Sequence, residues 1–270
     1  MTLALATAAC APADSTSYQL AAPGPRCSEA NSTITCAHVA ITLHGRRMFM
    51  MLPDGTAPAS GWPVAILFQG SFHPAEQFWT GHVGDEYGGY HQARVVRALL
   101  ENGFAVITPD APFGGSAYWQ TNVIGYANAW ESSDDHAVML ALLAALDAHS
   151  LGPLDAMRLF ASGISSGGYM TSRMAVSYRG RFRALAIQSA SYATCSGSLC
   201  TIPALPSDHP PTLFLHGEQD AIVPISTMRS YDDALRAQHT VERVVTDASA
   251  GHEWLAVSPD EIVALFRANL

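Results

Sequence analysis

A serine between glycines lies where an expected strand gives way to an expected helix. The segment Gly163-Ile164-Ser165-Ser166-Gly167 follows the hydrophobic run 157–161 and precedes the helix-like stretch 169–174. In that context a G-x-S-x-G turn lifts the serine hydroxyl above the end of a sheet, and the flanking glycines let the backbone pack tightly. Five letters alone are weak evidence, so the flanking elements carry the prediction that Ser165 is a nucleophile.

A candidate acid and a candidate base follow this serine, each on a loop after a later expected strand. Asp220 follows the strand 211–215, and His252 follows the strand 241–245. The order serine, aspartate, histidine is the one that α/β-hydrolases use. A rival histidine, His216, precedes the aspartate. The rival carboxylates fall in a proline-rich loop or on an expected helix, and they are Asp208, Asp232 and Asp233.

Two further loops carry residues that could serve the same reaction. In the loop 69–73, the backbone N–H of Ser71, or of Gly70, is expected to form an oxyanion hole with that of Ser166. A simple glycine turn is the alternative interpretation of this loop. The stretch 111–130 is rich in aromatic residues, which line clefts but also fill cores. The candidates for substrate contact are Trp119, Phe72, Tyr118 and Trp254.

The rest of the chain predicts one α/β domain that positions these residues. Short apolar strands alternate with helices at 93–101, 133–148, 228–237 and 259–268, which indicates a mostly parallel sheet with helices on both faces. Segments 34–43 and 46–52 flank His44-Gly45 and predict an N-terminal antiparallel hairpin. Only residues 189–210 separate two later strands, so no large lid is expected. The predicted fold is that of an α/β-hydrolase.

Composition excludes several classes of partner. The chain has 270 residues, of which 49% are hydrophobic and 14% charged, and its net charge is −9 without basic runs. Nucleic acid is therefore not an expected partner. No apolar stretch reaches the length of a transmembrane helix. There is no C-x-x-C pair or other zinc pattern, so neither a metal nor another cofactor is expected.

The N-terminal segment and the cysteines bear on localisation. Residues 1–11 resemble a clipped export signal, and Cys10 also hints at a lipid anchor, with an inconsequential disordered tail as the alternative. Residues 1–30 are expected to be leader and irregular chain, and 31–270 to form one catalytic domain. The close spacings of Cys27 with Cys36 and of Cys195 with Cys200 suggest two disulfides in an exported protein. Four reduced thiols in a cytosolic protein are the alternative.

Long runs around these residues resemble the extracellular medium-chain-length polyhydroxyalkanoate depolymerases. The resemblance extends over roughly residues 60 to 268. Its main runs are 163–169, 171–177, 191–197, 208–217 and 251–254, with shorter ones at 69–72 and 119–122. Runs of this length are far more specific than the pentapeptide alone.

The resemblance implies a secreted serine esterase with Ser165 as nucleophile, Asp220 as acid and His252 as base. It also implies a hydrophobic polyester substrate with side chains longer than methyl, such as poly(3-hydroxyoctanoate), and no separate binding domain. Segment 224–227 is polar where the family has tryptophans, so the way in which this protein would bind the polymer is an open question. Two alternatives remain: an esterase for small, aromatic or other polyester esters, and an inactive polymer-binding protein on a hydrolase scaffold.

Overall fold

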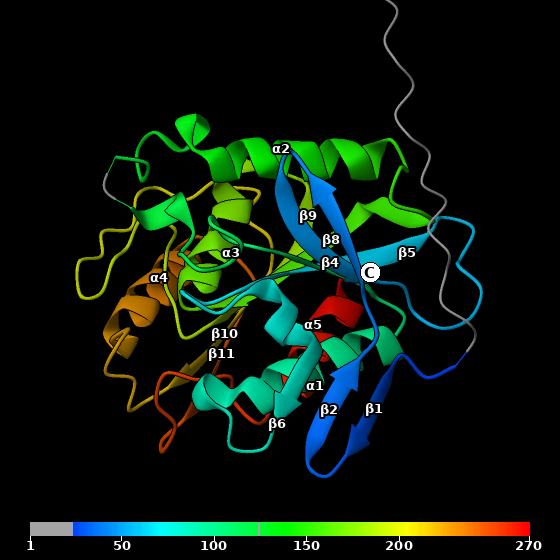
Figure 1. Ribbon diagram of the computed structural model, residues 1–270. Helices are drawn as coiled ribbons and strands as arrows, with labels where there is room; N and C mark the ends of the chain where they lie inside the picture. Colours follow the sequence, from blue (N-terminus) through cyan, green and yellow to red (C-terminus); the bar gives the residue numbers. More distant parts are fainter. Residues whose placement is uncertain (1–23, 124) are drawn as a thin grey trace, which may run out of the picture.

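An eight-stranded sheet crosses the centre of the computed structural model, which describes residues 24–123 and 125–270 (Figure 1). The strand order is β11-β10-β9-β8-β5-β7-β4-β3. Neighbours from β11 to β7 run parallel, and β4 and β3 add an antiparallel edge. The strands are β3 Val39–Leu43, β4 Arg46–Met51, β5 Trp62–Phe68, β7 Ala105–Pro109, β8 Leu154–Ile164, β9 Phe182–Gln188, β10 Thr212–Gly217 and β11 Glu242–Asp247. The predicted mostly parallel sheet is confirmed.

Helices cover both faces of this sheet. Their bounds are α1 Gly89–Glu101, α2 Asp134–Asp147, α3 Ser166–Ser177, α4 Ile225–Ala237 and α5 Ser258–Ala268. Side chains alternate along each strand, so β10 sends Leu213 and Leu215 to the core under α1 and α5, and Phe214 to the core under α4. Helices α2 and α3 pack on the same face as α4, as Figure 1 shows. The inner strands β5 and β7 are buried on both faces and are almost wholly apolar, whereas the edge strand β11 has no fully buried residue.

A small second sheet corrects two predictions about the N-terminal region. Strands β1 Cys27–Ala30, β2 Thr33–Cys36 and β6 Thr80–His82 form an antiparallel sheet that packs beside α1. Residues 27–30 were expected to be irregular, and residues 34–36 were expected in the central hairpin. The hairpin is confirmed only for β3 and β4. The predicted leader and Cys10 lie outside the described residues.

The connection after β9 contains no large lid. Residues 189–211 form no helix, and the Cys195–Cys200 disulfide closes their middle part. A second disulfide, Cys27–Cys36, joins β1 to β2. Among the described residues, no helix has both the length and the apolar composition that crossing a bilayer requires.

The buried carboxyl of Asp232, on α4, should make stability depend on pH. Burial, and then the hydrogen bond and charge of Glu242, raise the pKa of Asp232 above its ordinary value, although Arg236 lies 3.1 Å away and opposes the shift. The folded state therefore binds this proton more tightly than the unfolded chain does. The contribution of Asp232 to the free energy of unfolding of the protein should therefore fall as pH rises from about 4 toward neutrality.

Asp232→Asn should relieve this penalty, because the amide keeps the shape and removes the charge. We expect the Tm at pH 7.5 to rise by roughly 2–4 °C, which corresponds to about 1 kcal/mol in a chain of this size. Thermal unfolding at pH 5 and pH 7.5 measures the effect, and the gain should be smaller at pH 5. The exposed neighbour Asp233, changed to Asn, is the control. Equal Tm changes in the two variants would contradict the argument.

The predicted catalytic and oxyanion residues follow the carboxyl ends of parallel strands. Ser71 comes after β5, Ser165 after β8, Asp220 after β10 and His252 after β11. Because these strands are parallel, their carboxyl ends lie along one edge of the sheet, which is where open α/β sheets place ligand sites.

Candidate active site

Ser165 occupies a sharp turn between β8, which ends at Ile164, and α3. Its backbone has φ 55° and ψ −124°, a conformation that residues other than glycine rarely adopt. A Cβ on Gly163 would lie 2.6 Å from the carbonyl oxygen of Phe68, and a Cβ on Gly167 would collide with that same oxygen. Both glycines are therefore required by the close approach of β5, and the turn holds Ser165 at the end of the sheet.

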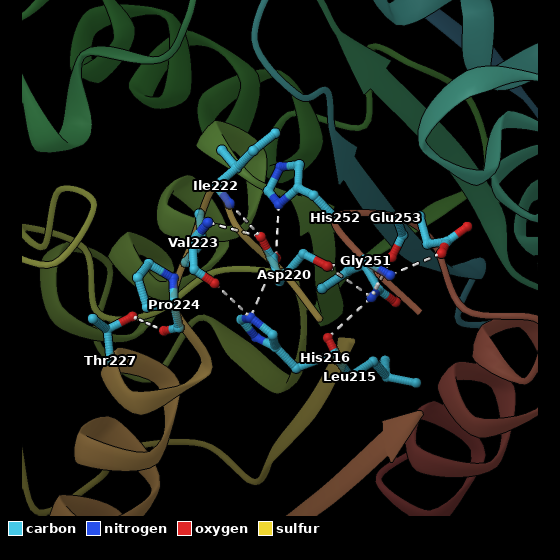
Figure 2. A network of polar contacts seen from close by, with 12 residues as sticks. Leu215, His216, Asp220, Ile222, Val223, Pro224, Thr227, Gly251, His252 and Glu253 are labelled. Carbon is cyan, nitrogen blue, oxygen red and sulfur yellow. Dashed lines mark hydrogen bonds and ion pairs between the residues drawn. The ribbon is translucent and has the colours of Figure 1, made fainter. Parts of the chain in front are cut away.

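Asp220 and His252 meet although 32 positions separate them in the sequence. The Nδ1 atom of His252 lies 2.8 Å from Oδ2 of Asp220. Figure 2 shows the two side chains facing each other across this contact. The other carboxylate oxygen accepts the backbone N–H groups of Ile222 and Val223, at 2.9 and 2.8 Å. A carboxylate at Nδ1 holds the proton on that nitrogen and leaves Nε2 as the basic atom.

The rival histidine, His216, supports the aspartate from its other side. It is fully buried, and its Nε2 lies 2.9 Å from the Val223 oxygen and 3.3 Å from Oδ2 of Asp220. Burial alone would raise the pKa of Asp220, but hydrogen bonds from His216, His252 and the Val223 N–H together hold that pKa far below its ordinary value. Asp220 is therefore ionised at neutral pH and can stabilise a positively charged imidazole.

Ser165 and His252 line one pocket of about 910 Å³. One wall is the loop from Gly70 to Pro74, and another contains Tyr87. Three acidic residues also line the pocket, and they are Glu76, Asp85 and Glu86. A pocket of this size can enclose most of a small organic ligand.

The predicted oxyanion donors have free backbone N–H groups on either side of the serine. Ser71 lines the pocket, and Ser166 is the first residue of α3, where helical N–H groups have no partner within the helix. Within residues 24–123 and 125–270, neither amide donates to another protein group. Unpaired amides beside a nucleophile are suited to stabilise an oxyanion.

Trp119 is buried and does not line the pocket, which corrects its predicted substrate contact. Its indole N–H donates to the carbonyl oxygen of Gln69 at 3.0 Å, and its backbone N–H donates to Oγ of Ser166 at 2.8 Å. The side chain of Gln69 donates in turn to the carbonyl oxygen of Gly115, at 2.8 Å. A buried indole needs an acceptor for its N–H, and here that acceptor fixes the oxyanion loop against the serine turn.

The other aromatic candidates divide between core and surface. Trp254 is buried against Phe78, with ring centroids 6.0 Å apart, so its predicted substrate contact is also wrong. Phe72 is exposed and lines the pocket. Tyr118 is exposed and contacts the Phe72 ring, with centroids 6.1 Å apart, but does not line the pocket. The aromatics predicted from the 111–130 loop therefore do not form the pocket wall.

Gln188 connects the serine turn to the histidine loop and was not predicted. Its carbonyl oxygen accepts the N–H of Ser165 at 3.1 Å, and its side-chain amide donates to the carbonyl oxygen of Glu253 at 2.8 Å. Its amide oxygen accepts the hydroxyl of Ser258 at 2.7 Å. The signal in the sequence was a polar residue after the apolar run 184–187, at the end of the strand next to the one that carries the serine.

Tyr87 also borders the site and was not predicted from the sequence. Its ring stands edge-on to His252, with centroids 6.0 Å apart, and it lines the pocket. Its carbonyl oxygen accepts the N–H of Trp254 at 2.9 Å, and a Cβ on Gly88 would lie 2.5 Å from the Trp254 oxygen. The loop before α1 is therefore docked directly on the histidine loop.

One pocket thus brings together groups of the types that acyl transfer uses: a half-buried serine, a histidine held by a buried carboxylate, and backbone amides without a protein partner among the described residues. Among the described residues, no group of three histidine, cysteine, aspartate or glutamate side chains is placed to hold a metal ion.

Comparison with known proteins agrees with this chemistry. A model of the dienelactone hydrolase family matches residues 83–266. A poly(3-hydroxyoctanoate) depolymerase from Pseudomonas fluorescens is 46% identical over 263 residues, which cover 93% of this chain and 94% of that protein.

Solved structures share the fold at low sequence identity. S-formylglutathione hydrolase from Staphylococcus aureus has a TM-score of 0.59 and 15% identity, over 86% of this chain and 95% of that one. Esterase PE8 has a TM-score of 0.57 and 16% identity, over 82% and 97% of the two chains. From the family model and the extent of the 46% identity it follows that the chain belongs to the dienelactone hydrolase family of α/β-hydrolases and is an ester hydrolase.

Proposed function

We propose that this protein hydrolyses the ester bonds of medium-chain-length polyhydroxyalkanoates such as poly(3-hydroxyoctanoate), with Ser165, His252 and Asp220 as its catalytic triad. The observation that carries the proposal is the 2.8 Å contact between His252 and Asp220 at a pocket that also contains Ser165. The choice of substrate rests on the name of the Pseudomonas fluorescens relative, which matches this chain over nearly its full length.

The acylation step begins when Nε2 of His252 removes the proton from Oγ of Ser165. The oxygen attacks the ester carbonyl, and the negative charge moves to the carbonyl oxygen, where the Ser71 and Ser166 amides stabilise it. Asp220 stabilises the imidazolium that forms. The imidazolium then protonates the leaving alkoxide, which departs as the hydroxyl end of one polymer fragment and leaves an acyl-enzyme.

Deacylation repeats these steps with water as the nucleophile. His252 removes a proton from the water molecule, the resulting hydroxide attacks the acyl carbonyl, and Oγ of Ser165 leaves with the proton that the imidazole returns. The products are a free carboxylic acid and the regenerated serine. Every proton in the cycle passes through one imidazole, so its orientation by Asp220 is central to the mechanism.

The polymer preference is tested with emulsified poly(3-hydroxyoctanoate) beside poly(3-hydroxybutyrate). We expect the enzyme to clear the first emulsion and to release its hydroxy acids at least tenfold faster than those of the second. Intact poly(3-hydroxyoctanoate) in the presence of an enzyme that turns over soluble esters would favour an esterase for small esters. The Ser165→Ala protein is the matched blank.

Chain length should also matter for soluble esters. Each methylene that the acyl chain buries contributes about 0.8 kcal/mol, so kcat/KM should rise from p-nitrophenyl acetate to the octanoate. Phe72→Ala should reduce the octanoate rate more than the acetate rate, because Phe72 lines the pocket. Trp119→Ala, in contrast, should affect both esters alike, because Trp119 supports the oxyanion loop. A best rate with acetate would contradict the medium-chain preference.

We also propose that the enzyme is secreted. The support is the pair of disulfides, Cys27–Cys36 and Cys195–Cys200, since disulfides persist in oxidising compartments. When the protein is denatured in an alkylating reagent without reductant, none of these four cysteines should become alkylated. Mass mapping of the alkylated cysteines makes the measurement, and reduced protein is the control. Four alkylated cysteines would indicate a reducing compartment.

A further inference from the structure

Five large apolar side chains are exposed on the loops that form the pocket or contact it. Phe113 is 87% exposed, Phe72 is 66% exposed and Ile222 is 54% exposed, with Tyr118 and Tyr87 at 46% and 41%. We call these five residues the apolar rim. Exposed apolar groups that gather in one place mark a surface that binds something, whereas scattered ones need no explanation.

The rim is continuous with the pocket. Phe72, Tyr87 and Ile222 line the pocket itself, and Tyr118 contacts Phe72. Phe113 lies on the loop 111–118, which contacts the pocket-lining loop 70–74 at two points. The N–H of Phe72 donates to Ala117 of that loop at 3.0 Å, and a Cβ on Gly115 would lie 2.6 Å from Cα of Pro74.

Three rim aromatics also carry backbone strain. Phe72, Tyr87 and Phe113 have φ values of 66°, 54° and 58°, in the left-handed region that favours glycine. The other described residues with positive φ, glycine aside, have polar side chains: Asn31, Ser32, His44, His149, Ser165, Ser189 and His239. Backbone preference does not explain an aromatic residue at these positions, and the rings of Phe72 and Phe113 stay mostly exposed, which fits a contact outside the molecule.

We propose that the apolar rim is the docking surface through which the enzyme adsorbs to the face of a neutral aliphatic polyester. The proposal rests on the proposed function and adds the surface by which the site reaches an insoluble substrate. A protein bound on the rim would cover the pocket, whereas a polymer chain at the interface can enter it. The net charge of −9 and the pocket carboxylates Glu76, Asp85 and Glu86 disfavour an anionic surface or a second copy of the chain.

The test measures adsorption separately from catalysis. The Ser165→Ala protein is incubated with poly(3-hydroxyoctanoate) films, and the bound fraction is measured across protein concentrations. Phe72→Asn and Phe113→Asn are added to this background singly and together, because asparagine accepts a left-handed backbone and is polar. Met157→Gln is the matched control: Met157 is 76% exposed but lies on β8 eight residues before Ser165, about 26 Å away along the strand.

We expect the double variant to bind the film roughly tenfold more weakly, the single variants to be intermediate, and Met157→Gln to bind as the parent does. Thermal unfolding of each variant should match the parent, since the changed side chains are exposed. Equal binding by the parent and the double variant would overturn the proposal. The proposal would also be overturned if the double variant lost a concentration-dependent dimer, measured by sedimentation, while its adsorption stayed unchanged.

The proposed function fails by a different result. If the wild-type enzyme adsorbs through the rim but leaves poly(3-hydroxyoctanoate) intact, the rim stands and the substrate assignment falls. If the enzyme degrades the polymer while the rim variants adsorb normally, the substrate assignment stands and the proposed role of the rim falls.

Discussion

Ser165→Ala is expected to lower kcat for p-nitrophenyl octanoate on the order of a million-fold, while the protein stays folded. The hydroxyl is the group that forms the acyl-enzyme, and removal of the nucleophile from a triad eliminates the covalent route. Alanine should tolerate the turn about as well as serine does, because both residues have a Cβ. Circular dichroism and Tm check the fold beside the turnover assay.

Ser162→Ala is the control for this variant. Ser162 lies three residues earlier on β8, is fully buried, and its hydroxyl has no partner among the described residues. We expect the control to keep turnover within a few fold of wild type. An alanine variant at position 165 that retained a tenth of the activity would remove Ser165 from the mechanism.

Asp220→Asn should lower kcat by about 10⁴-fold, by analogy with the same change in serine proteases. The asparagine amide can donate to Nδ1 of His252, which places the imidazole proton on Nε2 and removes the base. KM should change far less than kcat, because Asp220 does not line the pocket.

The matched control for this acid is Asp208→Asn. Asp208 is exposed and pairs with Arg179 at 2.8 Å, and its loss should leave kcat nearly unchanged. If Asp208→Asn were the damaging change and Asp220→Asn were silent, the choice of acid would be wrong.

The same aspartate should also contribute to acid sensitivity. Because its pKa is lowered in the folded state, the ionised form of Asp220 stabilises the fold at pH values above about 4, its ordinary range. That contribution is lost as pH falls toward the folded pKa. Asp220→Asn should therefore lower the Tm at pH 7 and make it less dependent on pH in strong acid.

The sequence was sufficient for the parts of the site that depend on local pattern. The serine turn needs a strand, two glycines and a helix within about 20 residues, and each leaves a local signal. Asp220 and His252 were predicted because chain order restricts which strand ends meet. The 2.8 Å contact between them agrees with that inference.

Residues whose position depends on distant contacts were harder to predict. Trp119 and Trp254 look like cleft aromatics in sequence, but hydrogen bonding to Gln69 and packing against Phe78 place them in the interior. Residues 34–36 alternate as the hairpin does, yet the disulfide to Cys27 and pairing with β6 hold them in another sheet.

The supporting residues Gln188 and Tyr87 were missed for the same reason. Gln188 acts through Glu253 and Ser258, more than 60 positions away, so no window of sequence reveals its partners. Tyr87 matters because its loop docks on Trp254. A polar strand end and a Tyr-Gly-Gly turn are the only local signs of these roles.

Identification of the serine that reacts with a fluorophosphonate ester tests most directly whether Ser165 is the nucleophile. The reagent mimics the tetrahedral intermediate and needs an activated nucleophile beside an oxyanion hole. After digestion, peptide mass mapping should place one phosphonate adduct on Ser165, and His252→Ala should slow its formation by several orders of magnitude. An adduct on a different serine, or no adduct on a folded protein, would contradict the assignment of Ser165 as the nucleophile.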